Sequence, residues 1–361
     1  MTDDLGGRKD DHLTLCAEGD VGFRSATTLL EGVRLVHDAL PELAVEDVDL
    51  SVRLFGKRLR APIVIASMTG GTDEAGRINH ALATIAEKRG YAFGLGSQRA
   101  MMKRPGSAPT FRVRDVAPTA LVLSNVGGVQ AARCGTDEIA ALVADVAADA
   151  LCVHLNPAME LVQPEGDRDF RGVLDAISRL VRELSVPVLA KETGCGIGPA
   201  TARKLRAAGV RHVDVSGAGG TSWVGVETRR AEGKDEAKRA LGEAFWDWGV
   251  PTAVSTAACA AAGFTTIIAT GGIASGLDVA RAIALGASAA GLARPVLQAL
   301  QSGGEAGVLR LLDGVEAELR TAMLLVGARD VSALRTAPRV LSGELRVWLD
   351  QLGLGAIATT L

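Results

Sequence analysis

The segment Ala150–Phe170, ALCVHLNPAMELVQPEGDRDF, decides how the rest of the chain is interpreted. It begins with the apolar run Ala150–Val153, which is typical of a strand buried on both faces. Polar and charged side chains then crowd into the following residues: His154, Asn156, Glu160, Glu165, Asp167, Arg168 and Asp169. A charged surface loop could have this composition, but an α/β fold also presents its chemistry where a buried strand opens into a polar loop. We therefore expect functional residues here.

The same pattern recurs along the chain from Pro62 onward. We expect eight strands, at Ile63–Ser67, Tyr91–Leu95, Ala120–Leu123, Ala150–Val153, Val186–Ala190, Val210–Val215, Thr265–Ala269 and Ala287–Leu292. Helical segments rich in Ala and Leu follow several of them, at Glu74–Arg89, Asp137–Ala148, Gly172–Leu184 and Pro199–Ala208. Eight successive βα units predict an α/β fold of the (β/α)8 TIM-barrel type. A doubly wound sheet would need fewer strands and a second domain boundary, which the sequence does not suggest.

We expect residues 1–361 to form a single domain in three parts: an N-terminal arm and hairpin (1–61), the barrel (62–297) and C-terminal helices (298–361). Val48–Leu54 and Arg58–Ala61 predict the hairpin, which could close one end of the barrel. Residues 1–45 before it are polar and then mildly helical, and Arg8 and Lys9 lie adjacent in an arm that looks disordered. Between the sixth and seventh strands, Val226–Glu243 mixes both charge signs and is either a solvated helix or a lid over the site.

Composition narrows the class of protein. Hydrophobic residues make up 48% of the chain and aromatic residues only 3%, so the core must be aliphatic. A net charge of −3 argues against a nucleic-acid partner. The five scattered cysteines suggest neither a zinc site nor disulfides, which fits a reducing cytoplasm. The N-terminus lacks a signal-peptide pattern and no apolar run reaches bilayer length, so we expect a cytoplasmic protein without a membrane partner.

In a barrel of this type the active site lies at the carboxyl ends of the strands. Gly271-Gly272 follow the seventh strand and precede a helix, and Ala293-Arg294 follow the eighth strand. Backbone N–H groups, a helix dipole and a cation at this place predict a phosphate site.

Lys191 ends an apolar strand, where a lysine is costly unless it is paired or used. It could pair with Glu192 or Glu160, or face a cofactor ring and stabilise negative charge such as that of a reduced flavin. The acids after the fourth strand, Glu160, Glu165 and Asp167, offer hard oxygen ligands that suit Mg²⁺, although all three need not bind it and Asp167 could instead pair with Arg168. His154 is a stronger candidate because Asn156 lies two residues further along the chain and therefore on the same face of the strand.

Taken together, these motifs resemble the type 2, flavin-dependent isopentenyl diphosphate isomerases. The resemblance covers residues 8 to about 330. It rests on RKDDH (8–12), MTGG (68–71), GSQR (96–99), HLNP (154–157), PEGDR (164–168), KE (191–192), SGAGGT (216–221), GG (271–272) and AR (293–294).

The resemblance implies an enzyme that interconverts isopentenyl and dimethylallyl diphosphate by allylic proton transfer. It implies reduced FMN, Mg²⁺, and NADPH or NADH as the reductant, in a homotetramer or homo-octamer whose arm completes a neighbour's site. Residues that match the family's FMN site are Ser67, Met68, Thr69, Gly70, Ser97, Asn125, Lys191, Ser216, Thr221, Gly271, Gly272, Ile273, Ala293 and Arg294. Arg8, Lys9, Ser97, Gln98 and Arg99 match the substrate site, Lys191, His154 and Asn156 the catalytic set, and Glu160 the metal ligand.

One position departs from the family, which carries Gln where this chain has Met159. A thioether can neither donate a proton nor act as a useful base. Three hypotheses therefore stay open: the isomerase, an FMN-binding homologue with altered substrate or lost turnover, and another FMN-dependent barrel oxidoreductase. Oxidases of 2-hydroxy acids carry a catalytic His near the seventh strand, and Ala253–Gly272 contains none.

Overall fold

A computed structural model of the protein describes residues 5–355 and contains a closed ring of parallel strands. The strands of the ring are β4 (Ile63–Ile65), β5 (Ala92–Gly94), β6 (Leu121–Gly127), β7 (Ala150–Leu155), β8 (Val188–Glu192), β9 (His212–Asp214), β10 (Thr266–Ala269) and β11 (Ala289–Leu292). Each strand pairs in parallel with the next along the chain, and β11 pairs with β4 to close the ring. The eight predicted strands and the TIM barrel are confirmed.

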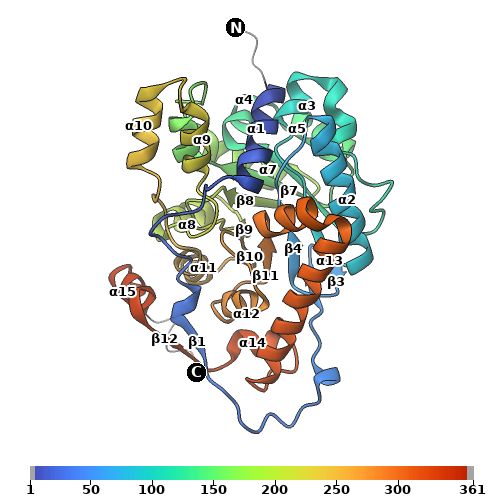
Figure 1. Ribbon diagram of the computed structural model, residues 1–361, viewed down its shortest axis with the longest axis vertical. Coiled ribbons are helices and arrows are strands. Elements are labelled where there is room, and N and C mark those ends of the chain that lie inside the picture. Colours follow the sequence, from blue (N-terminus) through green and yellow to red (C-terminus); the bar gives the residue numbers. More distant parts are fainter. Residues whose placement is uncertain (1–4, 356–361) are drawn as a thin grey trace.

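Helices surround this ring (Figure 1). They are α2 (Asp73–Arg89), α3 (Arg99–Lys103), α4 (Gly128–Arg133), α5 (Thr136–Asp145), α6 (Pro157–Val162), α7 (Val173–Glu183), α8 (Pro199–Ala207), α9 (Trp223–Ala231), α10 (Glu236–Ala244), α11 (Thr252–Ala261), α12 (Gly276–Ala284), α13 (Arg294–Leu324), α14 (Val331–Thr336) and α15 (Gly343–Gln351). The four predicted helices that follow strands correspond to α2, α5, α7 and α8. The C-terminal helix α13 is kinked at Gly304, whose φ is 57°.

The predicted hairpin is confirmed as β2 (Val52–Leu54) and β3 (Lys57–Leu59), which pair antiparallel. Leu54 and Leu59 pack into the apolar cluster that fills the inside of the barrel. That cluster includes residues near the start of several barrel strands, so the hairpin closes the amino-terminal end of the barrel.

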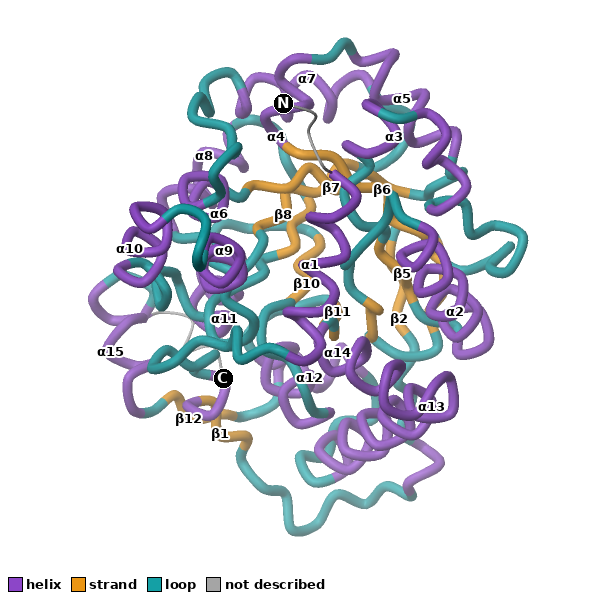
Figure 2. Tube along the Cα trace, turned by 45° about the horizontal axis from the view of Figure 1, so that its top comes forward, coloured by secondary structure: helices purple, strands orange, loops and turns teal. Residues whose placement is uncertain are grey.

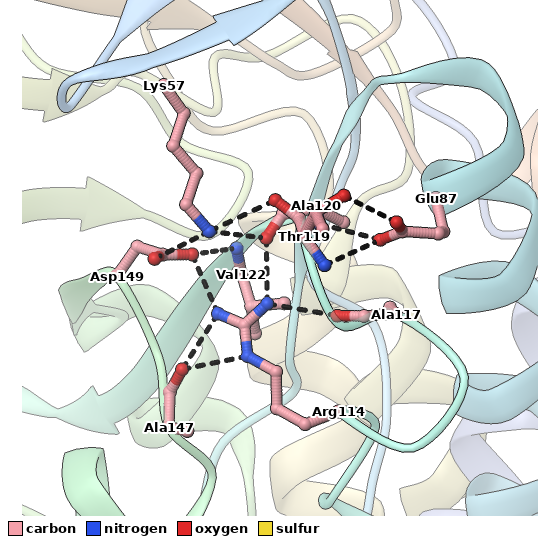
Figure 3. Close-up of polar contacts among 9 residues, drawn as sticks. All are labelled: Lys57, Glu87, Arg114, Ala117, Thr119, Ala120, Val122, Ala147 and Asp149. Carbon is pink, nitrogen blue, oxygen red and sulfur yellow. Dashed lines mark hydrogen bonds and ion pairs between the residues drawn. The ribbon is translucent and has the colours of Figure 1, made fainter.

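Polar contacts hold the hairpin in place, as Figure 3 shows. Lys57 Nζ lies 2.8 Å from a carboxylate oxygen of Asp149, the residue before β7. Asp149 also accepts hydrogen bonds from Arg114 Nη2 and from the backbone N–H of Val122, both at 2.8 Å. Burial by itself would raise the pKa of Asp149, but the bonds from Lys57, Val122 and Arg114 outweigh it and lower that pKa. These contacts stabilise the amino-terminal end of the barrel.

The prediction of a disordered arm is wrong for residues 5–18, which form helix α1 (Leu5–Glu18). Figures 1 and 2 show α1 in front of the ring of strands. Leu13, Cys16 and Ala17 are buried and form a short apolar face of α1. The polar residues around them in the sequence obscure this pattern. Arg294 Nε donates to Cys16 O at 2.8 Å, and Gln298 Nε2 donates to Ala17 O at 3.1 Å. The arm is therefore docked on its own barrel.

The charged segment 226–243 lies in α9 and α10. Val224–Thr228 are buried, so α9 is not a solvated helix, whereas most of α10 is exposed. The remaining strands, β1 (Val33–Leu35) and β12 (Arg339–Leu341), form a small antiparallel sheet that the sequence did not suggest. Short 3₁₀ turns complete the structure at Leu30–Gly32, Val45–Asp47 and Pro105–Thr110. Within residues 5–355, no helix is long and apolar enough to cross a membrane.

Candidate active site

A cavity of about 600 Å³ lies at the carboxyl end of the barrel, bounded on one side by α1. Residues that follow each of the eight barrel strands line it. Most of the predicted site residues are among them: Lys9, Ser67, Met68, Thr69, Ser97, Arg99, Asn125, His154, Asn156, Glu160, Lys191, Ser216, Thr221, Gly271, Gly272, Ile273, Ala293 and Arg294. Met159 also lines this cavity. The structure thus brings together residues that lie up to 285 positions apart.

Two of the other predicted residues, Gly70 and Gln98, do not line the cavity. The side chain of Arg8 lies outside the part of the chain that is described. Gly70 does not line the cavity, and a Cβ added to it would lie 2.0 Å from Phe111 Cε1, so it is a packing residue. Gln98 is fully buried behind the cavity wall, and its Oε1 accepts from Asn125 N at 3.1 Å. Its contacts favour support of Asn125 over contact with a substrate.

Lys191 has a partner that the sequence analysis did not name. Its Nζ donates to Asp214 Oδ2 at 2.8 Å, and both side chains are only 7% exposed. The expected partners Glu192 and Glu160 are engaged elsewhere. The reason is register: Lys191 on β8 pairs with Asp214 on β9, so the two side chains leave the same face of the sheet.

Glu192 faces away from Lys191 and shapes the next loop. Its Oε2 accepts from the backbone N–H groups of Thr193, Gly194, Cys195 and Gly196, at 2.7, 2.8, 2.5 and 3.1 Å. Burial raises the pKa of Glu192 to about 7 in spite of these bonds. Because Thr193 and Gly194 line the cavity, this carboxylate holds part of its wall.

His154 is fixed by an amide. Its Nδ1 lies 2.8 Å from Asn125 Oδ1, and since an amide oxygen only accepts, Nδ1 carries the proton. Burial, followed by the cations Lys9, Lys191 and Arg99, lowers the pKa of His154 to about 3. The imidazole is therefore neutral at physiological pH.

The acidic stretch after β7 is a short helix, α6, where a loop was expected. Glu160 is 7% exposed and accepts from Asn156 Nδ2 at 2.9 Å and from Asp167 N at 2.7 Å. The predicted pair of Asp167 with Arg168 is wrong. Asp167 contacts Arg133 at 2.9 Å, and Arg168 donates to the carbonyl of Gln163 at 2.7 Å.

Two glycine loops meet at the predicted phosphate site. A Cβ on Gly220 would lie 2.3 Å from Gly272 N, and one on Gly271 would lie 2.1 Å from Gly217 O. Gly271 and Gly272 also have φ values of 96° and 73°, which favour glycine. Side chains would separate these loops.

We expected the helix after Gly271-Gly272, which is α12, to direct its N-terminus at the phosphate site, but another helix does so. The N-terminus of α12 is capped by Ser275 and Asp278, and Glu318 accepts from Gly276 N at 2.8 Å. By contrast, α13 begins at Arg294, beside the cavity, and its N-cap residue Ala293 makes no side-chain hydrogen bond that caps the helix. The positive end of α13 is thus the one offered to an anion.

The residues present fit FMN. Among the described residues, buried Thr69 Oγ1 has no hydrogen-bond partner, and Thr69 lines the cavity. The backbone N–H groups of Gly272, Ile273 and Ala293 likewise donate to no described residue. Donors next to an uncapped helix end suit a phosphate, and Lys191 suits the flavin ring.

A metal ion in this cavity would need oxygen ligands from a bound substrate as well as from the protein. Within the described part of the chain, no three His, Cys, Asp or Glu side chains gather to hold an ion. Among residues 5–355, Glu160 alone lines the cavity with a carboxylate, and Mg²⁺ commonly binds through one or two carboxylates plus substrate phosphate oxygens. The donor set fits an ion that arrives with a phosphorylated substrate.

Some residues of the site were missed from the sequence. His12, Gln130, Trp223 and Thr270 line the cavity, and Asp214 lies behind it. Asp214 had a signal, because a carboxylate inside the apolar run Val210–Val215 needs a partner. His12 and Trp223 had none, since their contact depends on how α1 packs against α9.

Comparison with known proteins assigns the family. The chain is 46% identical over 348 residues to an isopentenyl-diphosphate delta-isomerase of Methanosarcina mazei, covering 96% of this chain and 94% of that protein. The chain belongs to the isopentenyl-diphosphate delta-isomerase family. An isopentenyl-diphosphate delta-isomerase of Nostoc sp. is 48% identical over 330 residues (91% and 93% of the two chains), and that of Pyrococcus furiosus is 43% identical over 352 residues (95% and 89%).

A broader family is also matched. Residues 141–341 match the FMN-dependent dehydrogenase family, so this member of the isopentenyl-diphosphate delta-isomerase family belongs to that group as well. Among solved structures, mandelate oxidase with (S)-2-phenylpropionate has a TM-score of 0.63 at 21% identity, over 93% of this chain and 97% of that one. That likeness concerns the fold alone.

Proposed function

We propose that this protein interconverts isopentenyl diphosphate and dimethylallyl diphosphate with reduced FMN and Mg²⁺, in isoprenoid biosynthesis. The observation that carries the proposal is the convergence in one cavity of a glycine-loop phosphate site, a buried lysine and an independent polar wall on β7 and α6. The proposal places two phosphorylated molecules in this cavity of about 600 Å³, a cofactor on one side and a substrate on the other. The family to which the chain belongs supports the same conclusion.

The substrate would lie between the cofactor and the polar wall. Lys9 and Arg99 line the cavity and carry the positive charge that a diphosphate needs. Glu160 would hold Mg²⁺ against the same diphosphate oxygens. Asn156, which donates to Glu160, and His154 would orient the polar end of the substrate.

The cofactor makes the proton transfers feasible. FMN, when bound in reduced form, would supply a group that gives and accepts protons at N5 or N1 next to an unactivated alkene. Lys191 Nζ would stabilise negative charge on the ring, and His154 would keep its own proton on Nδ1, where Asn125 accepts it. Helix α1 would exclude water from a cation-like state.

The setting of the enzyme belongs to the same proposal. NADPH or NADH would reduce the flavin, and the protein would act in the cytoplasm as a homotetramer or homo-octamer, with residues 1–361 as one domain. The docking of α1 on its own barrel brings Lys9 of the same chain to the cavity.

One experiment tests the proposal against its alternatives. The purified protein should be yellow and release FMN, and with reduced FMN and Mg²⁺ it should convert isopentenyl diphosphate into dimethylallyl diphosphate. Met159→Gln should be at least as active. Product from Met159→Gln alone would mean lost turnover in the natural chain, whereas oxidation of a 2-hydroxy acid without isomerisation would mean an oxidoreductase. Release of FAD, or of no flavin, would overturn the cofactor assignment.

A further inference from the structure

The buried carboxylate of Asp214 has no role in the function proposed above. Asp214 is 5% exposed and does not line the cavity, whereas its two partners, Lys191 and Thr270, both do. Removing a carboxylate and an ammonium from water is costly, and a buried ion pair contributes little net stability by itself. A pair at this place therefore calls for another explanation.

The register of the barrel builds this arrangement. Lys191 on β8 pairs directly with Asp214 on β9, and Asp214 pairs with Ile268 on β10. Thr270 lies two residues after Ile268 and so continues on the same face of the chain. Three neighbouring strands thus direct an ammonium, a carboxylate and a hydroxyl to one place.

Each oxygen of the carboxylate has a separate partner. Oδ2 accepts from Lys191 Nζ at 2.8 Å, and Oδ1 accepts from Thr270 Oγ1 at 2.5 Å. Lys191 Nζ also lies 3.5 Å from Thr270 Oγ1. The two bonds from Lys191 occupy two of its three N–H groups, and the third stays available for the cavity.

We infer that Asp214 and Thr270 are positioning residues, which hold the ammonium of Lys191 in one orientation toward the cofactor. Four rotatable bonds otherwise let a lysine adopt many positions, and a group that stabilises developing charge must be fixed in advance. The inference rests on the proposed function, in which Lys191 faces a reduced flavin. Asp214 acts through Lys191 and does not itself touch the cofactor.

The test uses Asp214→Asn in the FMN-loaded protein. Asparagine keeps the volume but removes the negative charge and replaces one of the two acceptor oxygens with an NH₂ group, which cannot accept from Lys191 or Thr270. We expect kcat to fall at least tenfold, with the KM for isopentenyl diphosphate changed less than twofold. We also expect the midpoint potential of bound FMN to fall, as it should in Lys191→Met, because the ammonium is absent in Lys191→Met and is no longer held toward the reduced ring in Asp214→Asn.

Whether the midpoint potential of the flavin rises or falls in Asp214→Asn distinguishes two roles for Asp214. If Asp214 acted on the flavin through its own charge, its removal would raise the potential, and the inference would be overturned. In a Lys191→Met background, Asp214→Asn should change kcat less than twofold; a full tenfold loss there would also overturn it.

Thr270 provides an independent variant that keeps the ion pair. Thr270→Val should lower kcat and the potential in the same directions by smaller amounts, and Thr270→Ser should behave like wild type. If Asp214→Asn does not fold, Thr270→Val decides, and a wild-type potential in that variant would refute the inference. A protein that binds FMN but does not act as an isomerase still has a measurable midpoint potential of the flavin. Failure of the proposed function can therefore be told apart from failure of this inference.

Discussion

At the scale of single residues, Glu160 separates substrate binding from cofactor binding. Its carboxylate lies on α6, which follows β7, whereas the glycine loops follow β9 and β10. We expect Glu160→Gln to raise the KM for the Mg²⁺–diphosphate substrate about 10- to 100-fold, the loss of one charge-assisted contact of about 1.5–3 kcal/mol, while FMN stays bound. Steady-state kinetics and flavin absorbance measure both.

A matched control lies five residues further on. Glu165 is exposed and does not line the cavity, so Glu165→Gln should leave the KM unchanged. Equal loss of flavin and substrate in Glu160→Gln would show that Glu160 does not belong to the substrate side.

His154 should make the protein sensitive to acid. Its folded pKa is lowered from 6.5 to about 3, first by burial and then by Lys9, Lys191 and Arg99. A lowered pKa stabilises the fold fully above pH 6.5, and this stabilisation is lost as the pH falls toward 3. Because the cavity leaves the ring partly exposed, we expect a loss on the order of 1 kcal/mol at pH 5.

Urea unfolding at pH 7.5 and pH 5 tests this. His154→Asn should lose less free energy of unfolding between the two pH values than wild type does. His37→Asn, at an exposed position, should follow wild type. Equal acid sensitivity of wild type and His154→Asn would contradict the argument.

At the scale of elements, helix α1 closes the cavity. The buried pair His12–Glu227, at 2.7 Å, and the bond from Arg294 to Cys16 O hold it in place. Helix α1 thereby carries Lys9 into the cavity, with Arg8 adjacent in sequence. Lys9 thus lies beside the cavity, while the apolar contacts of α1 dock the helix.

We expect Arg8→Ala/Lys9→Ala to weaken substrate binding without weakening the fold. Two charge-assisted contacts at about 1.5–3 kcal/mol each correspond to roughly 3–6 kcal/mol, seen as a raised KM or loss of saturation. Flavin content and Tm should stay near the wild-type values. The control is Arg203→Ala/Lys204→Ala, an adjacent, exposed pair on α8, and an unchanged KM in the arm variant would exclude the arm from the site.

At the scale of the whole molecule, the two ends of the barrel have different tasks. The carboxyl end carries the cavity, and the amino-terminal end is closed by the hairpin and the network around Asp149 (Figure 3). We expect Asp149→Asn to lower the free energy of unfolding by about 1–3 kcal/mol at pH 7, with KM and flavin content unchanged, because it weakens the bonds to Lys57 and Arg114.

The pH dependence of this loss has a definite sign. The folded pKa of Asp149 is lowered, so its stabilisation is present above the ordinary value near 3.8 and is lost as the pH falls below it. The difference between wild type and Asp149→Asn in urea should therefore shrink in strong acid. Asp175→Asn, exposed on α7, should match wild type at every pH. A loss of substrate affinity in Asp149→Asn would mean that the two ends are coupled.

The sequence by itself determined the eight strands, their order and the residues at their carboxyl ends, because apolar runs and the polar residues after them are local patterns. It determined most of the cavity lining for the same reason, since the ends of parallel strands meet at one end of a barrel.

Only the tertiary structure decided which polar groups pair. Asp214, and neither Glu192 nor Glu160, holds Lys191, because strand register sets which side chains leave the same face. Only the tertiary structure placed α1 across the cavity and showed that α13, and not α12, offers its N-terminus there. These outcomes depend on contacts between residues tens to hundreds of positions apart, for which local periodicity carries no signal.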